Sequence, residues 1–319
     1  MAMDKSVLVP LDGSEFSEHA LPLAVDIVRK AGGTLHLCHV RAPIAPVYSE
    51  TPLFVQDDLP QRMAAAESAR LQAYLDGVAS RIRKAAPGIV VTTNLQEGEP
   101  ALTLEKHAEV AGIDLVVMTS HARGALGRFW LGSVADELLR HLAAPILLVR
   151  PVANPPQVGA EVLPRQIMVP LDGTPLAEQM VRPAAELAKL CNAGLALVRV
   201  VKPVVAMSPP MGGTSMGQMA AELVDRLTTV QKELRKEALT YLEGVAAPLR
   251  AEGFHVLTRV TRDEQPAVAI LNEAELEGAG LVALATHGRR GLSRLVLGSV
   301  ADKVVRAAKM PVLLCRPRV

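Results

Sequence analysis

Two stretches of this chain occur twice in the same order, and this repeat constrains the fold more than any other feature. Val9-Pro-Leu-Asp-Gly13 recurs unchanged as Val169-Pro-Leu-Asp-Gly173, and Leu131-Gly-Ser-Val-Ala-Asp136 recurs as Leu297-Gly-Ser-Val-Ala-Asp302. The first pair is separated by 160 residues (9 to 169) and the second by 166 (131 to 297), so the second copy gains six residues in its middle. Such self-similarity indicates one structural unit used repeatedly. The sequence therefore predicts one domain written twice.

The length and composition fit this interpretation. A chain of 319 residues corresponds to about two domains. We expect the first domain at 1–152, a proline-containing linker at 153–164 and the second domain at 165–319. Half of the residues are hydrophobic but only 3% are aromatic, so Ala, Val and Leu must fill the cores. This composition is typical of parallel strands that helices cover on both faces.

Strands and helices are predicted to alternate in each copy. Apolar runs bounded by Gly, Pro or polar residues predict strands at 6–11, 34–40, 89–95, 114–119 and 145–149 in the first copy, and at 254–260, 281–285 and 311–315 among those of the second. A helix from Ser14 to about Lys30 follows the first strand, with Ser14 as N-cap, and Thr174 has this role in the second copy. Helices longer than ten residues between strands imply right-handed crossovers. The predicted fold class is α/β, with two tandem doubly wound parallel five-stranded sheets in the order 3-2-1-4-5, flanked by helices.

Charge and cysteine content indicate which partners and which cellular compartment the chain favours. The chain has 34 basic and 33 acidic residues, a formal charge of +1, so nothing favours nucleic acid or an anionic membrane. No apolar run approaches the roughly 18 residues needed to span a bilayer. The three cysteines lie far apart in apolar patterns, which argues against disulfides and favours a reduced, cytoplasmic setting. The apolar last strands, 146–149 and 312–315, would lie at sheet edges, so we expect them to pair into an intramolecular pseudo-dimer, with a homodimer of two chains also expected.

The loop after the fourth strand of each copy is the candidate binding site. It carries glycines and leads into a helix that starts at Ser133 or Ser299. Unpaired N–H groups at a helix start attract phosphate, and the helix dipole adds to this attraction. In a doubly wound sheet, ligands bind outside the carboxyl ends of the strands where the strand order reverses. The repeated Asp-Gly pairs, Asp12-Gly13 and Asp172-Gly173, would lie at the same edge, which predicts an anion-binding site there.

With these residues in view, both copies resemble universal stress protein domains, and the resemblance covers the whole chain. ATP-binding members of that family share G-x2-G-x9-G-[S/T] after the fourth strand, an Asp after the first and a Val at the end of the second. The second copy matches with Ala285-x2-Gly288-x9-Gly298-Ser299, Asp172 and Val200. The first copy matches with Thr119-x2-Ala122-x9-Gly132-Ser133, Asp12 and Val40.

The resemblance implies ATP with Mg²⁺ as the ligand. Asp172 would bind the adenosine part, Val200 would offer backbone groups to adenine, and Gly288, Gly298 and Ser299 would hold phosphates. The full set of nucleotide-binding residues implied for the second copy is Pro170, Leu171, Asp172, Gly173, Val200, Ala285, Thr286, His287, Gly288, Arg289, Gly298, Ser299 and Val300. A weaker or degenerate set in the first copy is Pro10, Asp12, Val40, Thr119, His121, Ala122, Arg123, Gly132, Ser133 and Val134.

The two copies are not expected to bind equally well. Ala122 places a methyl group where the family has a glycine whose backbone approaches phosphate. If this position needs a positive φ angle, alanine costs about 1–2 kcal/mol there, enough to weaken binding about tenfold. We therefore expect the second copy to hold the better site.

Each candidate also has a purely structural interpretation. Ser133 and Ser299 begin Ser-Val-Ala-Asp and are expected to cap their helices. Asp12 and Asp172 could form a turn or cap the next helix rather than bind a ligand. His121 and His287 have no recurring partner that would make them a base or a nucleophile, so no catalytic or metal-ligating residue is assigned.

Three functions remain in view. The preferred one is a nucleotide-dependent regulator of the stress response with at most slow ATP hydrolysis. The alternatives are a nucleotide-free dimerising interaction module, which the altered first copy favours, and an ATP hydrolase or phosphotransferase. There is no P-loop and no G-x-G-x-x-G after a first strand, so a dedicated kinase or dehydrogenase is not supported.

Overall fold

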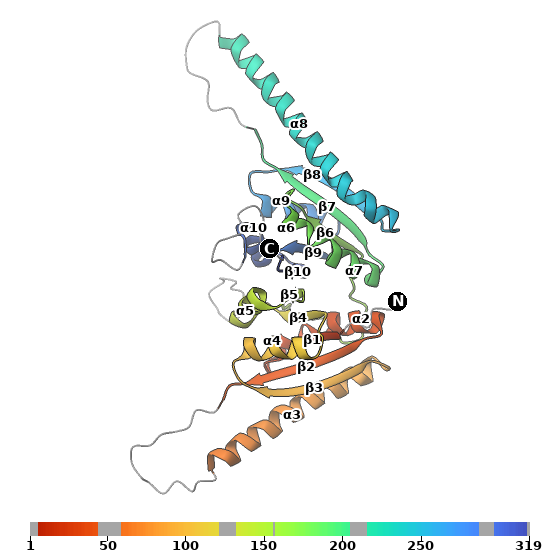
Figure 1. Cartoon of the computed structure of the whole chain (residues 1–319), viewed down its shortest axis with the longest axis vertical. Helices are drawn as coiled ribbons and strands as arrows, with labels where there is room; N and C mark the ends of the chain where they lie inside the picture. The colour runs from red at the N-terminus through yellow and green to blue at the C-terminus, as the bar shows by residue number, and fades with distance from the viewer. Residues whose placement is uncertain are drawn as a thin grey trace, which may run out of the picture. The chain divides into compact units, whose positions relative to one another are not determined.

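The computed structural model describes residues 6–43, 59–120, 132–155, 157–204, 216–286 and 297–317, without the side chains of 59–60 and 216–221. The chain divides into two compact units, one of residues 1–163 with 309–316 and one of 164–308 with 317–319. Figure 1 shows strands and helices in alternation along each repeat. None of the described helices combines the length and apolar composition that crossing a membrane requires.

The elements occur in the predicted order. The first repeat contains β1 (Ser6–Pro10), α1 (Glu15–Glu18), α2 (Leu21–Ala31), β2 (Thr34–Arg41), α3 (Leu59–Ala85), β3 (Val90–Glu97), α4 (Pro100–Val110), β4 (Leu115–Thr119), α5 (Ser133–His141) and β5 (Ile146–Val149). The second contains β6 (Gln166–Pro170), α6 (Pro175–Glu178), α7 (Val181–Cys191), β7 (Gly194–Val201), α8 (Met216–Ala251), β8 (Val256–Arg262), α9 (Pro266–Leu276), β9 (Leu281–Ala285), α10 (Ser299–Ala307) and β10 (Val312–Cys315).

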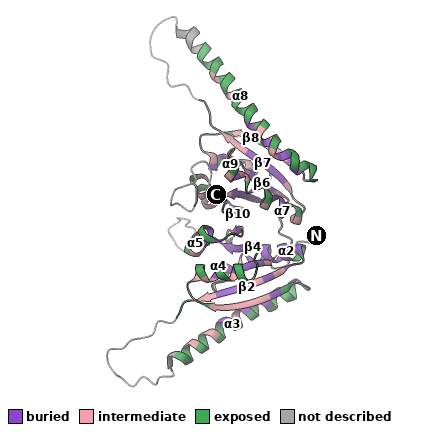
Figure 2. Ribbon diagram, in the orientation of Figure 1, coloured by how far each residue is buried: buried purple, intermediate pink, exposed green. Residues whose placement is uncertain are grey.

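The strand order confirms the predicted fold class. It runs β3-β2-β1-β4-β5 in the first repeat and β8-β7-β6-β9-β10 in the second, which is the order 3-2-1-4-5 twice. Neighbouring strands within the first repeat pair in parallel, for example Val7 with Leu35 on one side and with Leu115 on the other. In β1 the consecutive residues Val7, Leu8 and Val9 are all fully buried, so both faces of the strand are covered. Figure 2 shows this burial along the strands, with exposed residues on the outer faces of the helices.

Among the described strands, one pair is antiparallel and makes the sheet mixed. β10 belongs to the first compact unit, where Val312 pairs with Leu148 and Leu313 with Leu147 of β5. Leu147 and Leu313 are almost completely buried. The prediction that the two last strands meet is therefore confirmed, and this pair is the strand contact of the intramolecular pseudo-dimer.

The helix expected from Ser14 to Lys30 is interrupted, which corrects the prediction. α1 ends at Glu18 and α2 begins at Leu21, and α6 and α7 show the same break. Pro22 and Pro183 explain both breaks, because proline has no N–H for the carbonyl four residues earlier. The predicted caps are confirmed at the first segments. Ser14 accepts a hydrogen bond from Ser17 N, and Thr174 accepts one from Ala177 N.

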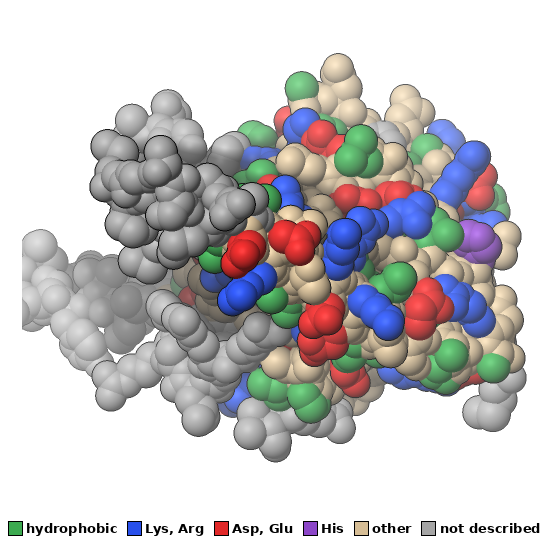
Figure 3. Space-filling view, turned by 90° about the horizontal axis from the view of Figure 1, so that it is seen from above, with side chains coloured by type: hydrophobic (Ala, Val, Ile, Leu, Met, Phe, Trp, Pro, Cys, Tyr) green, Lys and Arg blue, Asp and Glu red, His purple; other side chains and the backbone are tan. Residues whose placement is uncertain are grey.

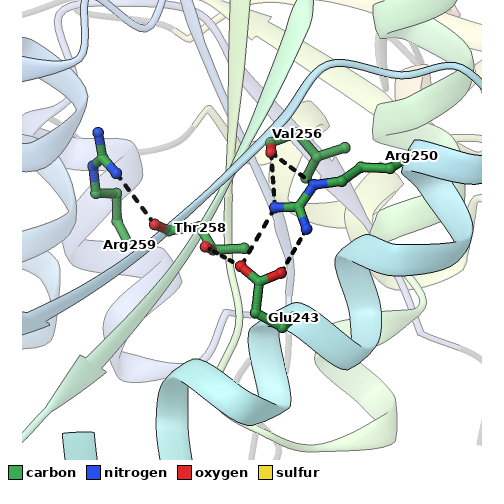
Figure 4. Close-up of polar contacts among 5 residues, drawn as sticks. All are labelled: Glu243, Arg250, Val256, Thr258 and Arg259. Atoms are coloured by element: carbon green, nitrogen blue, oxygen red, sulfur yellow. Dashed lines mark hydrogen bonds and ion pairs between the residues drawn. The ribbon is translucent and has the colours of Figure 1, made fainter. Parts of the chain in front are cut away.

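A polar clamp holds each long helix to the third strand of its repeat. In Figure 4, Glu243 of α8 accepts hydrogen bonds from Arg250 (2.5 Å) and from Thr258 Oγ1 of β8 (2.6 Å). Arg250 also donates from Nε to the carbonyl of Val256 at 3.1 Å. The first repeat has the same arrangement, in which Thr93 donates to Asp76 (3.0 Å) and Arg83 donates to the carbonyl of Val91 (2.7 Å).

Candidate functional site

The second repeat brings its candidate residues to one edge of the sheet. β6 lies between β7 and β9, and all three run in the same direction. Their carboxyl ends therefore meet at one edge. Asp172 follows β6, Val200 lies near the end of β7, and Thr286 follows β9. This is the edge at which ligands bind in doubly wound sheets.

Asp172 is fixed by a turn that its own carboxylate makes. Asp172 Oδ1 accepts hydrogen bonds from Thr174 N (3.0 Å) and from Thr174 Oγ1 (2.6 Å). Gly173 between them has φ +85°, a left-handed conformation that favours glycine. In the first repeat Asp12 Oδ1 accepts from Ser14 N (2.9 Å) and Ser14 Oγ (2.5 Å). Both aspartates thus form the predicted turn, which holds each carboxylate at the sheet edge.

Val200 presents its backbone to the same edge. The register of β6 with β7 ends at Pro170 and Val198, and Leu171 N donates to the carbonyl of Val198 at 2.8 Å. Backbone groups of alternate residues in a strand face the same side, so the N–H and C=O of Val200 also point toward β6, but β6 has already ended. Val201 faces the other way, and its carbonyl accepts from Asp263 N. Among the described strands, none pairs with Val200 on this side.

Val40 has the same position in the first repeat. Leu11 N donates to the carbonyl of Cys38 at 2.8 Å, and Arg41 faces β3, where its carbonyl accepts from Gly98 N. Both valines therefore offer a donor and an acceptor just beyond the end of the first strand. A planar heterocycle with one donor and one acceptor on its edge fits such a pair.

The starts of α10 and α5 correct the predicted roles of the serines. The N-caps are Gly298 and Gly132, and among the described residues no side chain caps either helix start. Ser299 and Ser133 are instead the first helical residues. A helix start without a side-chain cap leaves its first-turn N–H groups available to an anion. The sequence could not distinguish these cases, because Gly and Ser stand side by side and both occur at N-caps.

A backbone hydrogen bond joins the described residues on either side of segment 287–296. Gly298 N donates to the carbonyl of Thr286 at 2.7 Å, which joins the residue after β9 to the residue before α10. Thr286 is completely buried. The uncapped helix start is thereby anchored beside the end of β9, with Val300 in its first turn. In the first repeat Thr119 ends β4 as a buried residue, and Val134 follows Ser133 in α5.

Some predicted site residues lie outside the described residues. These are His121, Ala122 and Arg123 of the first repeat and His287, Gly288 and Arg289 of the second. Pro10 and Pro170 end their strands, Leu171 is buried, and Ala285 ends β9 as a partly buried residue. Among the described residues, no group of three or more His, Cys, Asp or Glu is placed to hold a metal ion.

Arg199 lies at this edge, although the sequence did not single it out. Its guanidinium group lies near Gly173, where a β-carbon would be 3.1 Å from an Nη atom of Arg199. The same group stacks on the ring of Tyr241, 4.8 Å from its centre, and the Tyr241 hydroxyl donates to Glu178 at 2.8 Å. A positive charge is thus held next to the Asp172 turn. The signal that could have found Arg199 in the sequence is its basic side chain directly before Val200, the valine that matches the family motif.

The first repeat has a different residue in this place. His39 precedes Val40 as Arg199 precedes Val200. His39 is 8% exposed, and its Nδ1 atom is buried without a hydrogen-bond partner among the described residues. The hydrogen bond from tyrosine to glutamate is the same in both repeats, because Tyr74 donates to Glu18 at 3.0 Å. The two candidate sites therefore share their backbone framework and differ in the side chain beside it, Arg199 in the second repeat and His39 in the first.

Comparison with known proteins agrees with the repeat. The family model described as "Universal stress protein family" matches residues 3–150 and 164–316. A universal stress protein of Mycolicibacterium smegmatis is 29% identical over 325 aligned positions, covering 99% of each chain. Universal stress protein YxiE of Bacillus subtilis is 28% identical over 151 positions, which cover 98% of that protein but 47% of this chain. The crystal structure of a universal stress protein from Archaeoglobus fulgidus superposes with TM-score 0.61 at 18% identity, covering 99% of this chain and 97% of the other.

Proposed function

Because this chain belongs to the universal stress protein family, we propose that it binds ATP with Mg²⁺ at the second repeat. It would act as a nucleotide-dependent regulator in the stress response, with slow hydrolysis at most. The observation that carries the proposal is a pair of features at one edge of the sheet: a Val200 backbone that no described strand pairs on the β6 side, and a start of α10 that no described side chain caps. One can receive a base and the other a phosphate.

The residues at this edge suit the parts of an adenine nucleotide. The Val200 N–H and C=O match the acceptor and donor on the edge of adenine. The Asp172 carboxylate can accept hydrogen bonds from ribose hydroxyls. The first turn of α10, Ser299 and Val300, can receive phosphate oxygens through its N–H groups. Mg²⁺ would enter bound to phosphate oxygens, because it keeps several waters and binds nucleotides mainly through phosphate.

Two differences favour the second repeat over the first. Gly288 stands where the first repeat has Ala122, and glycine allows closer approach of the backbone to phosphate. Arg199 places a positive charge beside the Asp172 turn, where the first repeat has His39. A polyanion gains from a fixed guanidinium group, since hydrogen bonds to charged partners are about twice as strong as neutral ones.

The proposal includes a cytoplasmic location and self-association of two chains. Cys38, Cys191 and Cys315 are thiols that form no disulfide within the described part of the chain, as expected in a reducing compartment. Within the chain, β5 and β10 already form the pseudo-dimer contact.

Nucleotide release from the purified full-length chain tests the proposal. We expect one ATP or ADP per chain after denaturation, and one binding site when stripped protein is titrated with ATP and Mg²⁺. Gly288→Trp would fill the phosphate site and abolish binding, whereas Ala122→Trp in the first repeat would leave it intact. Val200→Pro removes the backbone N–H from the edge and also fixes φ at this position, so Val40→Pro, the same change in the first repeat, is its matched control. Thermal unfolding of each variant separates lost binding from lost folding.

Other results would select another function. Two nucleotides per chain would contradict the difference between the repeats. If the protein releases no nucleotide and shows no titratable binding, the nucleotide-free interaction module is favoured. Rapid turnover that disappears in His287→Ala or Asp172→Ala would favour an ATP hydrolase or phosphotransferase.

A further inference from the structure

The N-terminal half of α8 carries an apolar stripe that the described part of the second unit leaves uncovered. α8 packs on β7 and β8 from Ala238 onward, and in the preceding 222–237 every residue is exposed or only partly buried. Leu223, Val230 and Leu234 are 37%, 45% and 38% exposed. Figure 2 shows this half of the helix as almost wholly exposed. Leucine and valine side chains in such a row favour burial against a partner.

The spacing of the stripe is that of a coiled-coil seam. Leu223, Leu227, Val230 and Leu234 follow one another at intervals of four, three and four residues, which are the d, a, d and a positions of a heptad. The stripe is not inherited from the shared domain. Tyr74 and Tyr241 align the two long helices with an offset of 167 (74 to 241), and the first repeat then has the mainly polar or helix-breaking set Gln56, Pro60, Met63 and Glu67.

The charges beside the stripe select an antiparallel partner helix. Arg226 and Glu233 are exposed and occupy successive g positions. In an antiparallel pair of identical helices with Leu227 facing Val230, g positions face g positions, so Arg226 of each copy meets Glu233 of the other. A parallel pair would instead place Arg226 against Gln231 and Glu233 against Ala238. Figure 3 shows both signs of charge interspersed on the side where α8 lies, so the position of charges, not net charge, would specify a partner.

The surroundings of the helix leave room for this arrangement. Gln231, at an e position, accepts a hydrogen bond from Val204 N at 2.8 Å, so the chain's own backbone lies along the e side. The g side, with Arg226 and Glu233, is exposed. Because the sheet holds α8 only beyond Ala238, an antiparallel pair would place the two folded bodies at opposite ends of the shared seam. A parallel pair would bring both bodies to the same end.

We propose that a second copy of this chain binds the α8 stripe, through an antiparallel helix pair closed by reciprocal Arg226–Glu233 contacts. The seam is short compared with a standard interface, so the dimer forms and dissociates with concentration. It is separate from the β5–β10 contact within one chain. It also does not depend on nucleotide, so its failure and the failure of the nucleotide proposal are distinguishable.

Sedimentation of the full-length chain tests this proposal. We expect a monomer–dimer equilibrium when the concentration is raised to about 0.5 mM, where even a dimer with a Kd of about 0.1 mM would be mostly associated. Val230→Glu should reduce association at least tenfold. Leu239→Glu is the matched control, because Leu239 is 42% exposed but lies nine residues from Val230, on the opposite side of the helix. The control should associate like the wild type.

Charge exchange distinguishes the antiparallel pair from other interfaces. Arg226→Glu alone and Glu233→Arg alone would each place like charges together and weaken association. An equimolar mixture of these two variants would restore it, because a chain with acidic residues at both g positions then pairs with a chain that has basic residues at both. A wild type that stays monomeric, a dimer insensitive to Val230→Glu, or a mixture without restored association would overturn the proposal.

Discussion

Arg199 holds its guanidinium carbon 4.8 Å from the centre of the Tyr241 ring, and this contact joins β7 to α8 at the edge of the sheet where the candidate site lies. Tyr241 is itself fixed by its hydrogen bond to Glu178. Burial is the main cause that raises the pKa of Tyr241 above its ordinary value, and the Glu178 contact adds to it, while Arg199 acts in the opposite direction. The Tyr241 side chain therefore stays protonated and neutral where it stacks against Arg199.

The contact between Arg199 and Tyr241 should be measurable as a coupling energy. Arg199→Met keeps most of the side-chain volume and removes the cation, which should lower the free energy of unfolding by about 0.5–2 kcal/mol. In a Tyr241→Leu background the same change should cost less. Urea unfolding of the four proteins in this cycle gives the coupling. Tyr241→Phe keeps the ring, so Arg199→Met should cost as much there as in the wild type; equal costs in the leucine background would contradict the contact.

Gly173 and Gly13 form a natural pair for testing what Arg199 adds. Both have positive φ angles, +85° and +82°, but of the two only Gly173 would bring an added β-carbon against a described group, Arg199. Gly13→Ala should therefore cost only backbone strain, about 1–2 kcal/mol. Gly173→Ala should cost the same backbone strain. Because it also displaces the guanidinium group, it should lose about 0.5–2 kcal/mol more from the contact with Tyr241. Chemical unfolding measures both.

The Arg199→Met background separates the two contributions. With the guanidinium group removed, Gly173→Ala should cost no more than Gly13→Ala. An unchanged excess in that background would show that Arg199 is not its source.

Much of the fold was predictable because the repeat and the apolar patterns are local in the sequence. The order of elements along the chain and the caps at Ser14 and Thr174 follow from such patterns, and the strand order 3-2-1-4-5 was expected from the fold class that they indicate. The break between α1 and α2 was missed although Pro22 was visible, because the apolar pattern continues across it. The cap at Gly298 was missed because which of two neighbouring residues caps a helix depends on the path of the chain into it.

The site was predictable only in part, for a physical reason. Asp172 could be placed because the ends of parallel strands meet at one edge, whereas Val200 was singled out by the resemblance to the family motif. The role of Arg199 depends on Tyr241 in the long helix, and nothing local in the sequence pairs a residue of β7 with one of α8. The open edge at Val200 likewise depends on where β6 stops, which only the register of the sheet reveals.

Two histidines should make the first unit less stable in mild acid. His36 and His107 lie with ring centres 6.0 Å apart, and burial lowers the pKa of both below the ordinary 6.5. In addition, His107 Nδ1 contacts Gln96 at 3.0 Å, while its Nε2 is buried without a hydrogen-bond partner in the described part of the chain. As the pH falls below about 6.5, the unfolded chain binds protons before the folded one, so the free energy of unfolding decreases. Above that pH neither state is protonated and the contribution is constant.

Chemical unfolding at a series of pH values checks this dependence. His107→Gln should flatten the decrease below pH 6.5, because the amide does not titrate in this range. His141→Gln, at an exposed position in the last turn of α5, is the control and should leave the slope unchanged. A decrease that persists fully in His107→Gln would assign it to other groups.

The three cysteines should differ in their rate of modification by a thiol reagent. Burial raises the pKa of Cys38 to about 12 and that of Cys315 to about 11, and both side chains are buried. The thiolate is the reactive form, so at pH 8 these two should react only as fast as the protein opens. Cys191, partly exposed at the end of α7, should react first. In a disulfide-exchange assay we expect one fast thiol in the folded protein and the other two after addition of denaturant. Cys191→Ser should remove the fast phase; rapid reaction of a second thiol in the folded state would contradict the burial of β2 or β10.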